Sequence, residues 1–254
     1  MVTPKEREAT RERIADCCRK LILSQRMVEL CEQEGTPKQE EFLAHVLEQE
    51  LLRREQSKRT RQLNRACFPV LKSFDGYEFG AVRFPPALTR DELLSCRFIM
   101  EKKNLILYGP VGVGKTHLAI ALGVKACGMG MNVRFHTVTE LVLKLGEAHR
   151  SGTLEKLVRD LQKLDLLILD EWGYVPVDKE GSQLLFRVVA DSYESKSLIL
   201  TTNLEFSKWG GIFTDEQMAA VMIDRLIHHG HLLLFEGQSY RMTHALMRQT
   251  AKTG

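Results

Sequence analysis

The stretch Gly109-Pro-Val-Gly-Val-Gly-Lys-Thr116, here called the phosphate loop, matches the pattern G-x-x-x-x-G-K-[ST]. The apolar run 104–108 before it predicts a buried strand, and residues 117–127 after it carry apolar side chains at helical spacing. Glycines let backbone N–H groups turn toward an anion, and the N-terminus of the following helix adds partial positive charge. Strand, glycine loop and helix in this order predict phosphate binding, whereas the alternative is a glycine-rich turn without a ligand.

The nucleotide contacts expected from this motif come from the loop and the residue after it: Gly109, Pro110, Val111, Gly112, Val113, Gly114, Lys115, Thr116 and His117. Lys115 is expected to reach the β- and γ-phosphates of ATP, and the Thr116 hydroxyl to bind Mg²⁺. Downstream, Leu166-Leu-Ile-Leu-Asp170-Glu171 predicts a second buried strand that ends in two acids. Asp170 is then a metal ligand beside Thr116, and Glu171 is the catalytic base that polarises the attacking water.

Two further side chains are candidates for the same catalytic reaction. Asn203 follows the strand predicted over 197–201, where its carboxamide can bind both the γ-phosphate and the attacking water; the alternative is an asparagine in a turn. Arg225 lies late in the helix predicted over 214–229, and an arginine from a neighbouring subunit can neutralise charge on a transferring phosphoryl group. The alternative for Arg225 is a surface pair with Asp224, which contributes little. Arg241 either serves a nucleotide or packs at the end of the chain.

The composition is typical of a cytoplasmic globular protein. The 254 residues are 44% hydrophobic, enough for a real core, and no apolar run is long enough to cross a bilayer. Residues 1–13 are crowded with charge and do not resemble a secretory signal. The six cysteines show neither metal-ligand spacing nor a disulfide framework, so we expect reduced, buried thiols, with zinc binding as the alternative.

Positive charge is concentrated ahead of the phosphate loop. Residues 53–72 carry a net charge of +6, although the whole chain carries only +3. Arg54, Lys58, Arg61 and Arg65 recur there at spacings of four, three and four, which places them on one stripe of a helix. Together with Arg59 they are candidate contacts to the phosphate backbone of DNA, which they would recognise by its charge and not by its base sequence. The alternative is a solvated helix face.

Two amphipathic helices are predicted before the phosphate loop. The first covers 5–33; the second begins at Thr36-Pro37, continues to about Ala66 and stops before Pro69. They predict a small helical module over 1–66 for DNA binding and oligomerisation. Residues 67–103 are expected to form a connector, with a helix over 89–100 and spaced aromatic residues that pack it onto the next domain.

Beyond the phosphate loop, predicted strands and helices alternate. The strands cover 132–136, 165–169, 197–201 and 231–235, and the helices cover 137–148, 153–163, 181–193 and 214–229. Continuous apolar strands alternating with helices predict an α/β domain over 104–254, whose parallel sheet is covered by helices on both faces. Ligands of such sheets bind at the carboxyl ends of strands, where the phosphate loop, the two acids and Asn203 all fall.

Several strings together resemble the IstB-like ATP-binding proteins, the transposition helper ATPases of bacterial insertion sequences, which are relatives of the DnaC helicase loaders within the AAA+ class. The strings are the phosphate loop with His-Leu-Ala119, Asp170-Glu-Trp-Gly-Tyr-Val-Pro176, Leu184-Leu-Phe186, Thr202-Asn203, Trp209, Asp224-Arg-Leu-Ile-His228 and Gly237-Gln-Ser-Tyr-Arg241. The resemblance is close over about 65–245 and looser over the N-terminal helices. Ser192 departs from it, because many relatives are expected to carry arginine there.

This resemblance implies a AAA+ P-loop core without the usual C-terminal lid. It implies that ATP drives assembly of homo-oligomers on double-stranded DNA, with Arg225 acting across the subunit interface, and that the assembly recruits or stimulates a partner transposase. An alternative is a DnaC-like loader that grips a replicative helicase and single-stranded DNA. A third alternative, a small-molecule kinase built on a phosphate loop, needs an acceptor pocket and a lid that the sequence does not indicate.

Overall fold

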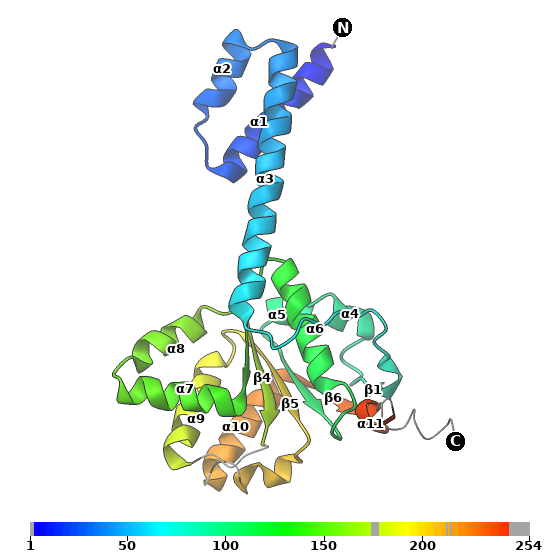
Figure 1. Ribbon diagram of the computed structural model, residues 1–254, viewed down its shortest axis with the longest axis vertical. Helices are drawn as coiled ribbons and strands as arrows, with labels where there is room; N and C mark the ends of the chain where they lie inside the picture. Colours follow the sequence, from blue (N-terminus) through cyan, green and yellow to red (C-terminus); the bar gives the residue numbers. More distant parts are fainter. Residues whose placement is uncertain (1–2, 174–177, 212, 214, 244–254) are drawn as a thin grey trace, which may run out of the picture. The chain divides into compact units, whose positions relative to one another are not determined.

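The computed structural model describes residues 3–173, 178–211, 213 and 215–243 (Figure 1). The chain divides into two compact units, Met1–Arg61 and Gln62–Gly254, which are described separately below. Within the described residues, no helix is both long and apolar enough to cross a membrane.

The first unit is built from α1 (Pro4–Leu21), α2 (Arg26–Glu34) and the first part of α3 (Pro37–Ala66). The prediction of one helix over 5–33 is wrong, because the chain breaks after Leu21. Ile22 adopts a left-handed conformation with φ of 60°, and the amide of Leu23 closes the helix end by donating to the Cys18 carbonyl at 2.8 Å. The break folds α2 back, so that Cys31 packs against the core that contains Cys18. In a straight helix these two residues would lie about 20 Å apart.

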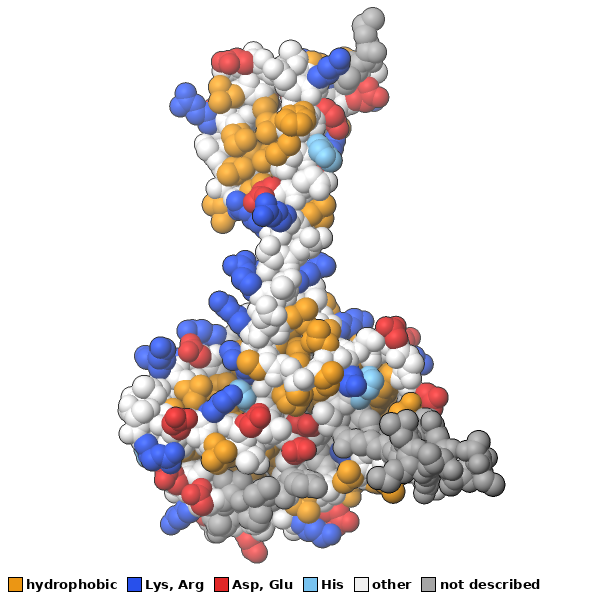
Figure 2. Space-filling model, viewed as in Figure 1, with side chains coloured by type: hydrophobic (Ala, Val, Ile, Leu, Met, Phe, Trp, Pro, Cys, Tyr) orange, Lys and Arg blue, Asp and Glu red, His pale blue; other side chains and the backbone are white. Residues whose placement is uncertain are grey.

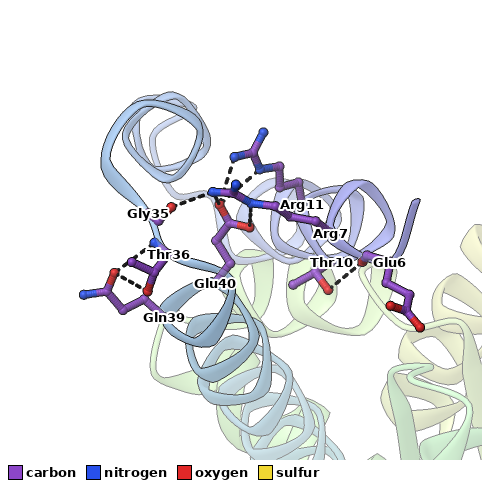
Figure 3. Close-up of polar contacts among 8 residues, drawn as sticks. All are labelled: Glu6, Arg7, Thr10, Arg11, Gly35, Thr36, Gln39 and Glu40. Carbon is purple, nitrogen blue, oxygen red and sulfur yellow. Dashed lines mark hydrogen bonds and ion pairs between the residues drawn. The ribbon is translucent and has the colours of Figure 1, made fainter. Parts of the chain in front are cut away.

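A buried carboxylate joins α1 to the start of α3 (Figure 3). Glu40 is 1% exposed, and its carboxylate accepts hydrogen bonds from Arg7 Nε and Nη2 at 3.0 Å and from Arg11 Nη2 at 3.0 Å. Arg7 Nη2 also donates to the carbonyl of Gly35, in the turn between α2 and α3. The hydrogen bond from Arg7 is the largest cause that lowers the pKa of Glu40. Arg7 of α1 therefore binds both Glu40 of α3 and the turn that follows α2.

The second unit contains a six-stranded sheet in the order β1-β6-β2-β5-β4-β3. Its strands are β1 (Val82–Arg83), β2 (Asn104–Tyr108), β3 (Val133–Thr137), β4 (Leu166–Trp172), β5 (Ser197–Thr202) and β6 (Gly230–Phe235). Strands β2 to β6 are parallel, as predicted, whereas β1 pairs with β6 in the antiparallel direction. Strand β1 was not predicted, because a two-residue strand in the connector has no detectable alternation.

Helices cover both faces of this sheet, which confirms the prediction of a covered α/β sheet (Figure 1). The helices after the phosphate loop are α6 (Lys115–Gly128), α7 (Val138–Arg150), α8 (Leu154–Gln162), α9 (Lys179–Ser192), α10 (Glu216–His228) and α11 (Tyr240–Thr243). On β2, Leu105 and Leu107 enter the core shared with α6, and Ile106 enters the core shared with α7, α9 and α10. Successive side chains of one strand thus anchor opposite layers.

The connector packs onto the sheet unit through its aromatic residues, as predicted. Phe74, Tyr77, Phe79 and Phe84 all contact the core that contains α6. Phe79 begins the 3₁₀ turn η1 (Phe79–Ala81). The helix predicted over 89–100 is instead two short helices, α4 (Arg90–Leu94) and α5 (Arg97–Met100). Between them Cys96 has φ of 58°, and this bend buries Cys96 together with residues from both helices, including Leu93 and Phe98.

Candidate nucleotide-binding site

The phosphate loop leaves the sheet at the end of β2 and enters α6 at Lys115. Three of its glycines have positive φ: Gly109 at 155°, Gly112 at 83° and Gly114 at 97°. Gly112 also has a neighbour from far along the chain, because a Cβ there would lie 2.1 Å from Ser239 Oγ. The Tyr240 amide donates to the Gly112 carbonyl at 3.0 Å. The segment after β6 thus packs on the loop, a contact that the sequence pattern does not indicate.

The charged end of Lys115 lies against its own loop. Its Nζ donates to the carbonyls of Gly109 and Pro110, at 2.7 and 2.6 Å. The ammonium therefore lies at the start of the loop, where it can exchange these carbonyls for phosphate oxygens. Carbonyl oxygens carry a partial negative charge and phosphate oxygens a full one, so both accept hydrogen bonds from an ammonium.

The connector covers one side of the loop. His117, a predicted nucleotide contact, has its Nε2 2.8 Å from the Ser73 carbonyl, and its ring centroid is 5.1 Å from that of Tyr77. Tyr77 in turn donates its hydroxyl to the Gly114 carbonyl at 3.3 Å. Burial raises the pKa of Tyr77, so its phenol stays protonated. The prediction for His117 remains untested, while Tyr77 is a loop contact that sequence reasoning missed.

The two predicted metal ligands, which are far apart in the sequence, meet in the structure. Thr116, at the start of α6, donates its hydroxyl to Asp170 Oδ1 at 2.9 Å. Asp170 lies in β4, is 5% exposed, and accepts a second hydrogen bond from the hydroxyl of Thr201 in β5. A carboxylate and a hydroxyl side by side are hard oxygen ligands of the kind that Mg²⁺ prefers, so these residues fit the expected ion.

Glu171, the predicted base, stands at an irregularity of β4. The pairing with β5 shifts between Leu169 and Trp172, so that the strand carries an extra residue at this point. Glu171 has φ of 62°, is exposed, and donates its amide to Thr201 Oγ1 at 3.1 Å. Such bulges are frequent beside active sites, where they redirect side chains.

Asn203 follows β5 directly and is exposed. Its neighbour Thr202 pairs with Tyr108 of β2, and the Gly109 amide donates to the Thr202 carbonyl at 3.2 Å. Asn203 therefore emerges from the sheet beside the point where the phosphate loop begins. The Thr202 hydroxyl donates to the Trp172 carbonyl at 2.9 Å, which links this strand end to the one that carries Glu171.

Arg225 lies in α10 and is half-buried, with its guanidinium 5.5 Å from the centre of the Phe186 ring of α9. In the part of the chain that the structure describes, no ion pair joins Arg225 to Asp224, so the surface-pair alternative has no support there. The side chain of Arg241 and residues 174–176 of the resembling strings lie outside the described residues. Ser192 is buried and donates its hydroxyl to the Val188 carbonyl within α9 at 2.7 Å.

The five predicted DNA contacts all lie on α3 and are all exposed: Arg54, Lys58, Arg59, Arg61 and Arg65. Figure 2 shows lysine and arginine side chains (blue) along this helix. Arg54 is partly engaged, because its Nε lies 2.8 Å from a Glu50 oxygen. Arg61 Nε donates to the Ser57 carbonyl of its own helix at 3.3 Å. The stripe is thus accessible to an anionic partner, although Arg54 already has an intramolecular one.

A family model described as "IstB-like ATP binding protein" matches residues 23–248 of this chain. The chain belongs to the family of IstB-like ATP-binding proteins. It is 40% identical to the "Insertion sequence IS21 putative ATP-binding protein" of Pseudomonas aeruginosa, over 80% of this chain and 76% of that protein. It is 35% identical to the "Insertion sequence IS5376 putative ATP-binding protein" of Geobacillus stearothermophilus, over 91% of this chain and 94% of that protein.

Solved structures agree on the fold of this IstB-like protein. The crystal structure of the DnaC helicase loader superposes with a TM-score of 0.51 and 22% identity, over 69% of this chain and 99% of that one. A DNA replication initiation factor superposes with a TM-score of 0.51 and 20% identity, over 63% of this chain and 49% of that one. The second unit therefore has the AAA+ P-loop fold expected from the resemblance.

Proposed function

We propose that this IstB-like protein is a Mg²⁺-dependent ATPase that assembles as a homo-oligomer on double-stranded DNA and recruits or stimulates a partner transposase. The observation that carries the ATPase part is the hydrogen bond between Thr116 and Asp170, 2.9 Å long, at the helical end of the phosphate loop. Two residues predicted independently to hold one ion lie in contact there. The names of the relatives, which refer to insertion sequences, support the link to transposition.

In this proposal the loop amides and Lys115 bind the phosphates, while Thr116 and Asp170 would hold Mg²⁺, which neutralises charge on the β- and γ-phosphates. Glu171 takes a proton from a water molecule as the oxygen of that water bonds to the γ-phosphorus. The bond from the γ-phosphorus to the bridging oxygen breaks, and ADP leaves. Asn203 orients the water. Arg225 of a neighbouring subunit stabilises the charge on the transferred group.

The basic stripe on α3 supports the DNA part of the proposal. Duplex DNA carries a dense row of phosphates, and exposed arginines and lysines along one helix neutralise it without reading bases. We place the protein in the cytoplasm, and we expect DNA to raise its rate of ATP hydrolysis because assembly brings Arg225 to the adjacent site.

The test measures binding to a duplex of random sequence, oligomer size and ATP turnover, each with and without ATP and Mg²⁺. Lys115→Ala should lower ATP affinity at least about tenfold, because a charge-assisted contact to phosphate is lost, and should abolish ATP-dependent assembly. Glu171→Gln should bind ATP normally but stall turnover and accumulate the assembled state. If neither DNA affinity nor oligomer size of the wild type changes when ATP is added, the proposal is wrong.

The similarity in fold to the DnaC helicase loader keeps a helicase loader as the second candidate. A capture experiment with the immobilised protein separates the two, using purified replicative helicase in one arm and the transposase encoded beside this protein's gene in the other. Retention of the transposase with ATP and duplex DNA supports the proposal, whereas retention of the helicase alone favours a loader.

A further inference from the structure

Thr201 occupies a special position opposite the bulge of β4. Pairing between β4 and β5 is regular up to Leu169 opposite Leu200, and it resumes with Trp172 opposite Thr202. Two residues of β4, Asp170 and Glu171, therefore face the single residue Thr201. These two are the predicted metal ligand and the predicted base.

The hydroxyl of Thr201 binds both members of the bulge. It donates to Asp170 Oδ1, and it accepts the Glu171 amide at 3.1 Å. A threonine hydroxyl has one hydrogen to donate and lone pairs to accept with, so this one group can bind the Asp170 carboxylate and the Glu171 backbone amide at the same time. Thr201 is 2% exposed, and water is therefore not available to replace it in either contact.

The backbone at Glu171 needs this support. Its φ of 62° is in the left-handed region, which costs an L-residue other than glycine free energy unless the surroundings enforce it. Without the Thr201 hydroxyl, the Glu171 amide would lose its acceptor and the bulge would be free to relax. Since the Glu171 side chain begins at this backbone, any relaxation moves its carboxylate.

We propose that Thr201 is a positioning residue, whose hydroxyl sets the Asp170 carboxylate and the Glu171 backbone in one fixed arrangement for ATP hydrolysis. The inference rests on the roles assigned to Asp170 and Glu171 under the proposed function. Thr116 also donates to Asp170 Oδ1, but its hydroxyl is the expected ligand of the metal ion. When Thr116 turns to the ion, Thr201 still holds the carboxylate.

The experiment compares three variants of the full chain for turnover, ATP affinity and thermal unfolding. Thr201→Val keeps the shape of the side chain but removes the hydroxyl, and Thr201→Ser restores the hydroxyl without the methyl group. Ser197→Ala is the matched control, because Ser197 is a fully buried residue at the other end of β5 whose hydroxyl donates to the Phe98 carbonyl at 3.1 Å. If Thr201→Val does not fold, Thr201→Ala takes its place.

Thr201→Val should lower kcat by about 10- to 100-fold, the size of effect that a small misplacement of catalytic groups produces, with ATP affinity within about threefold of the wild type. Thr201→Ser and Ser197→Ala should stay within about threefold of wild-type kcat. In the Glu171→Gln background, Thr201→Val should cause a clearly smaller loss of turnover than in the wild type, because the part of its effect that acts through Glu171 is already gone.

The inference is overturned if Thr201→Val retains wild-type kcat, if Thr201→Ser loses as much as Thr201→Val, or if the losses from Thr201 and Glu171 multiply. It is also overturned if every variant of Thr201 unfolds, since the hydroxyl then serves the fold. These outcomes leave wild-type hydrolysis intact and are therefore distinct from failure of the proposed function, in which the wild type itself neither binds nor hydrolyses ATP; the inference then fails with it.

Discussion

Gly109 lies where the phosphate loop leaves the sheet, directly against the neighbouring strand. A Cβ at this position would be 2.3 Å from the backbone oxygen of Phe235, the last residue of β6. Backbone atoms in a central sheet have little room to shift, so this contact cannot be relieved as a flexible side chain could relieve it. The φ of 155° adds a second restriction. Gly109 is therefore required by the packing of the sheet as well as by phosphate binding.

We predict that Gly109→Ala destabilises the protein by about 2 kcal/mol or more even without nucleotide, because β2 and β6 must separate to admit the methyl group. Urea-induced unfolding in ATP-free buffer measures this. Gly128→Ala is the control, since a Cβ there has no neighbour within 4 Å and the residue ends α6. The control should leave stability unchanged or raise it slightly. Equal unfolding curves for Gly109→Ala and the wild type would contradict the prediction.

At the scale of elements, the first unit depends on ion pairs that differ in burial. Glu40 is buried and binds two arginines, whereas Glu48 pairs with Arg13 at 2.8 Å between side chains that are both at least 36% exposed. An exposed pair contributes little because water and salt screen it, but a buried carboxylate with several donors stabilises the packing of α1 on α3.

We predict that Glu40→Gln weakens the helical unit by about 2 kcal/mol, and that Glu48→Gln costs less than about 1 kcal/mol. Urea unfolding followed by circular dichroism at 222 nm (a standard helix band) measures both. Because the folded state lowers the pKa of Glu40 below its usual 4.5, the stability it adds is present above that value and is lost as the pH falls through its folded-state pKa. The difference in the free energy of unfolding between the wild type and Glu40→Gln should therefore become smaller in acid. A difference that does not change with pH would contradict this account.

The basic stripe on α3 should determine how strongly DNA affinity depends on salt concentration. The logarithm of DNA affinity falls linearly with the logarithm of salt concentration, and each phosphate contact makes that fall steeper by about 0.9. The double variant Lys58→Ala, Arg61→Ala should therefore make the slope shallower by about 2. Fluorescence anisotropy with labelled duplex at several salt concentrations measures the slope. Lys20→Ala on α1 is the control, because its ammonium already pairs with Asp16 at 2.6 Å. An unchanged slope in the double variant would remove the stripe from the DNA interface.

For the whole molecule, the open question is whether Arg225 serves its own phosphate loop or that of a neighbour. Its contact in the structure is with Phe186, on the adjacent helix of the same subunit. Among the described residues, no hydrogen bond or ion pair joins it to the loop, and its guanidinium lies over the Phe186 ring instead. An arginine provided by a neighbour would make each active site a shared one.

We predict that mixing Arg225→Ala with Lys115→Ala restores ATPase activity that neither variant has alone. Lys115→Ala does not assemble alone, but its subunits can join at interfaces where an Arg225→Ala subunit binds ATP. At such an interface an intact loop from one variant meets an intact arginine from the other, which gives at most about a quarter of wild-type turnover at equal amounts. Turnover of the mixture on duplex DNA measures this. The double variant mixed with either single variant is the control and should stay inactive. An inactive mixture of variants that do co-assemble would show that Arg225 acts within its own subunit.

Local sequence determined the strand, the phosphate loop and the helix after it, because apolar runs and glycine conformations are properties of neighbouring residues. The same holds for the acids that follow the apolar run of β4 and for the basic spacing on α3. These signals sufficed to predict an α/β sheet covered on both faces and to nominate Thr116 and Asp170 as partners, whereas the AAA+ class followed from the resemblance to the IstB-like proteins. Their pairing followed from the rule that the carboxyl ends of parallel strands meet at one edge of the sheet.

Only the tertiary structure decided the break after Leu21, the bend at Cys96, the antiparallel strand β1 and the bulge at Glu171. Each depends on atoms that lie far away in the sequence: a shared core in the first two cases, the edge of β6 in the third and the Thr201 hydroxyl in the last. Unfavourable backbone conformations persist where such distant contacts contribute more free energy than the conformation costs locally. A local sequence pattern cannot predict those contacts, because the residues that make them lie elsewhere in the chain.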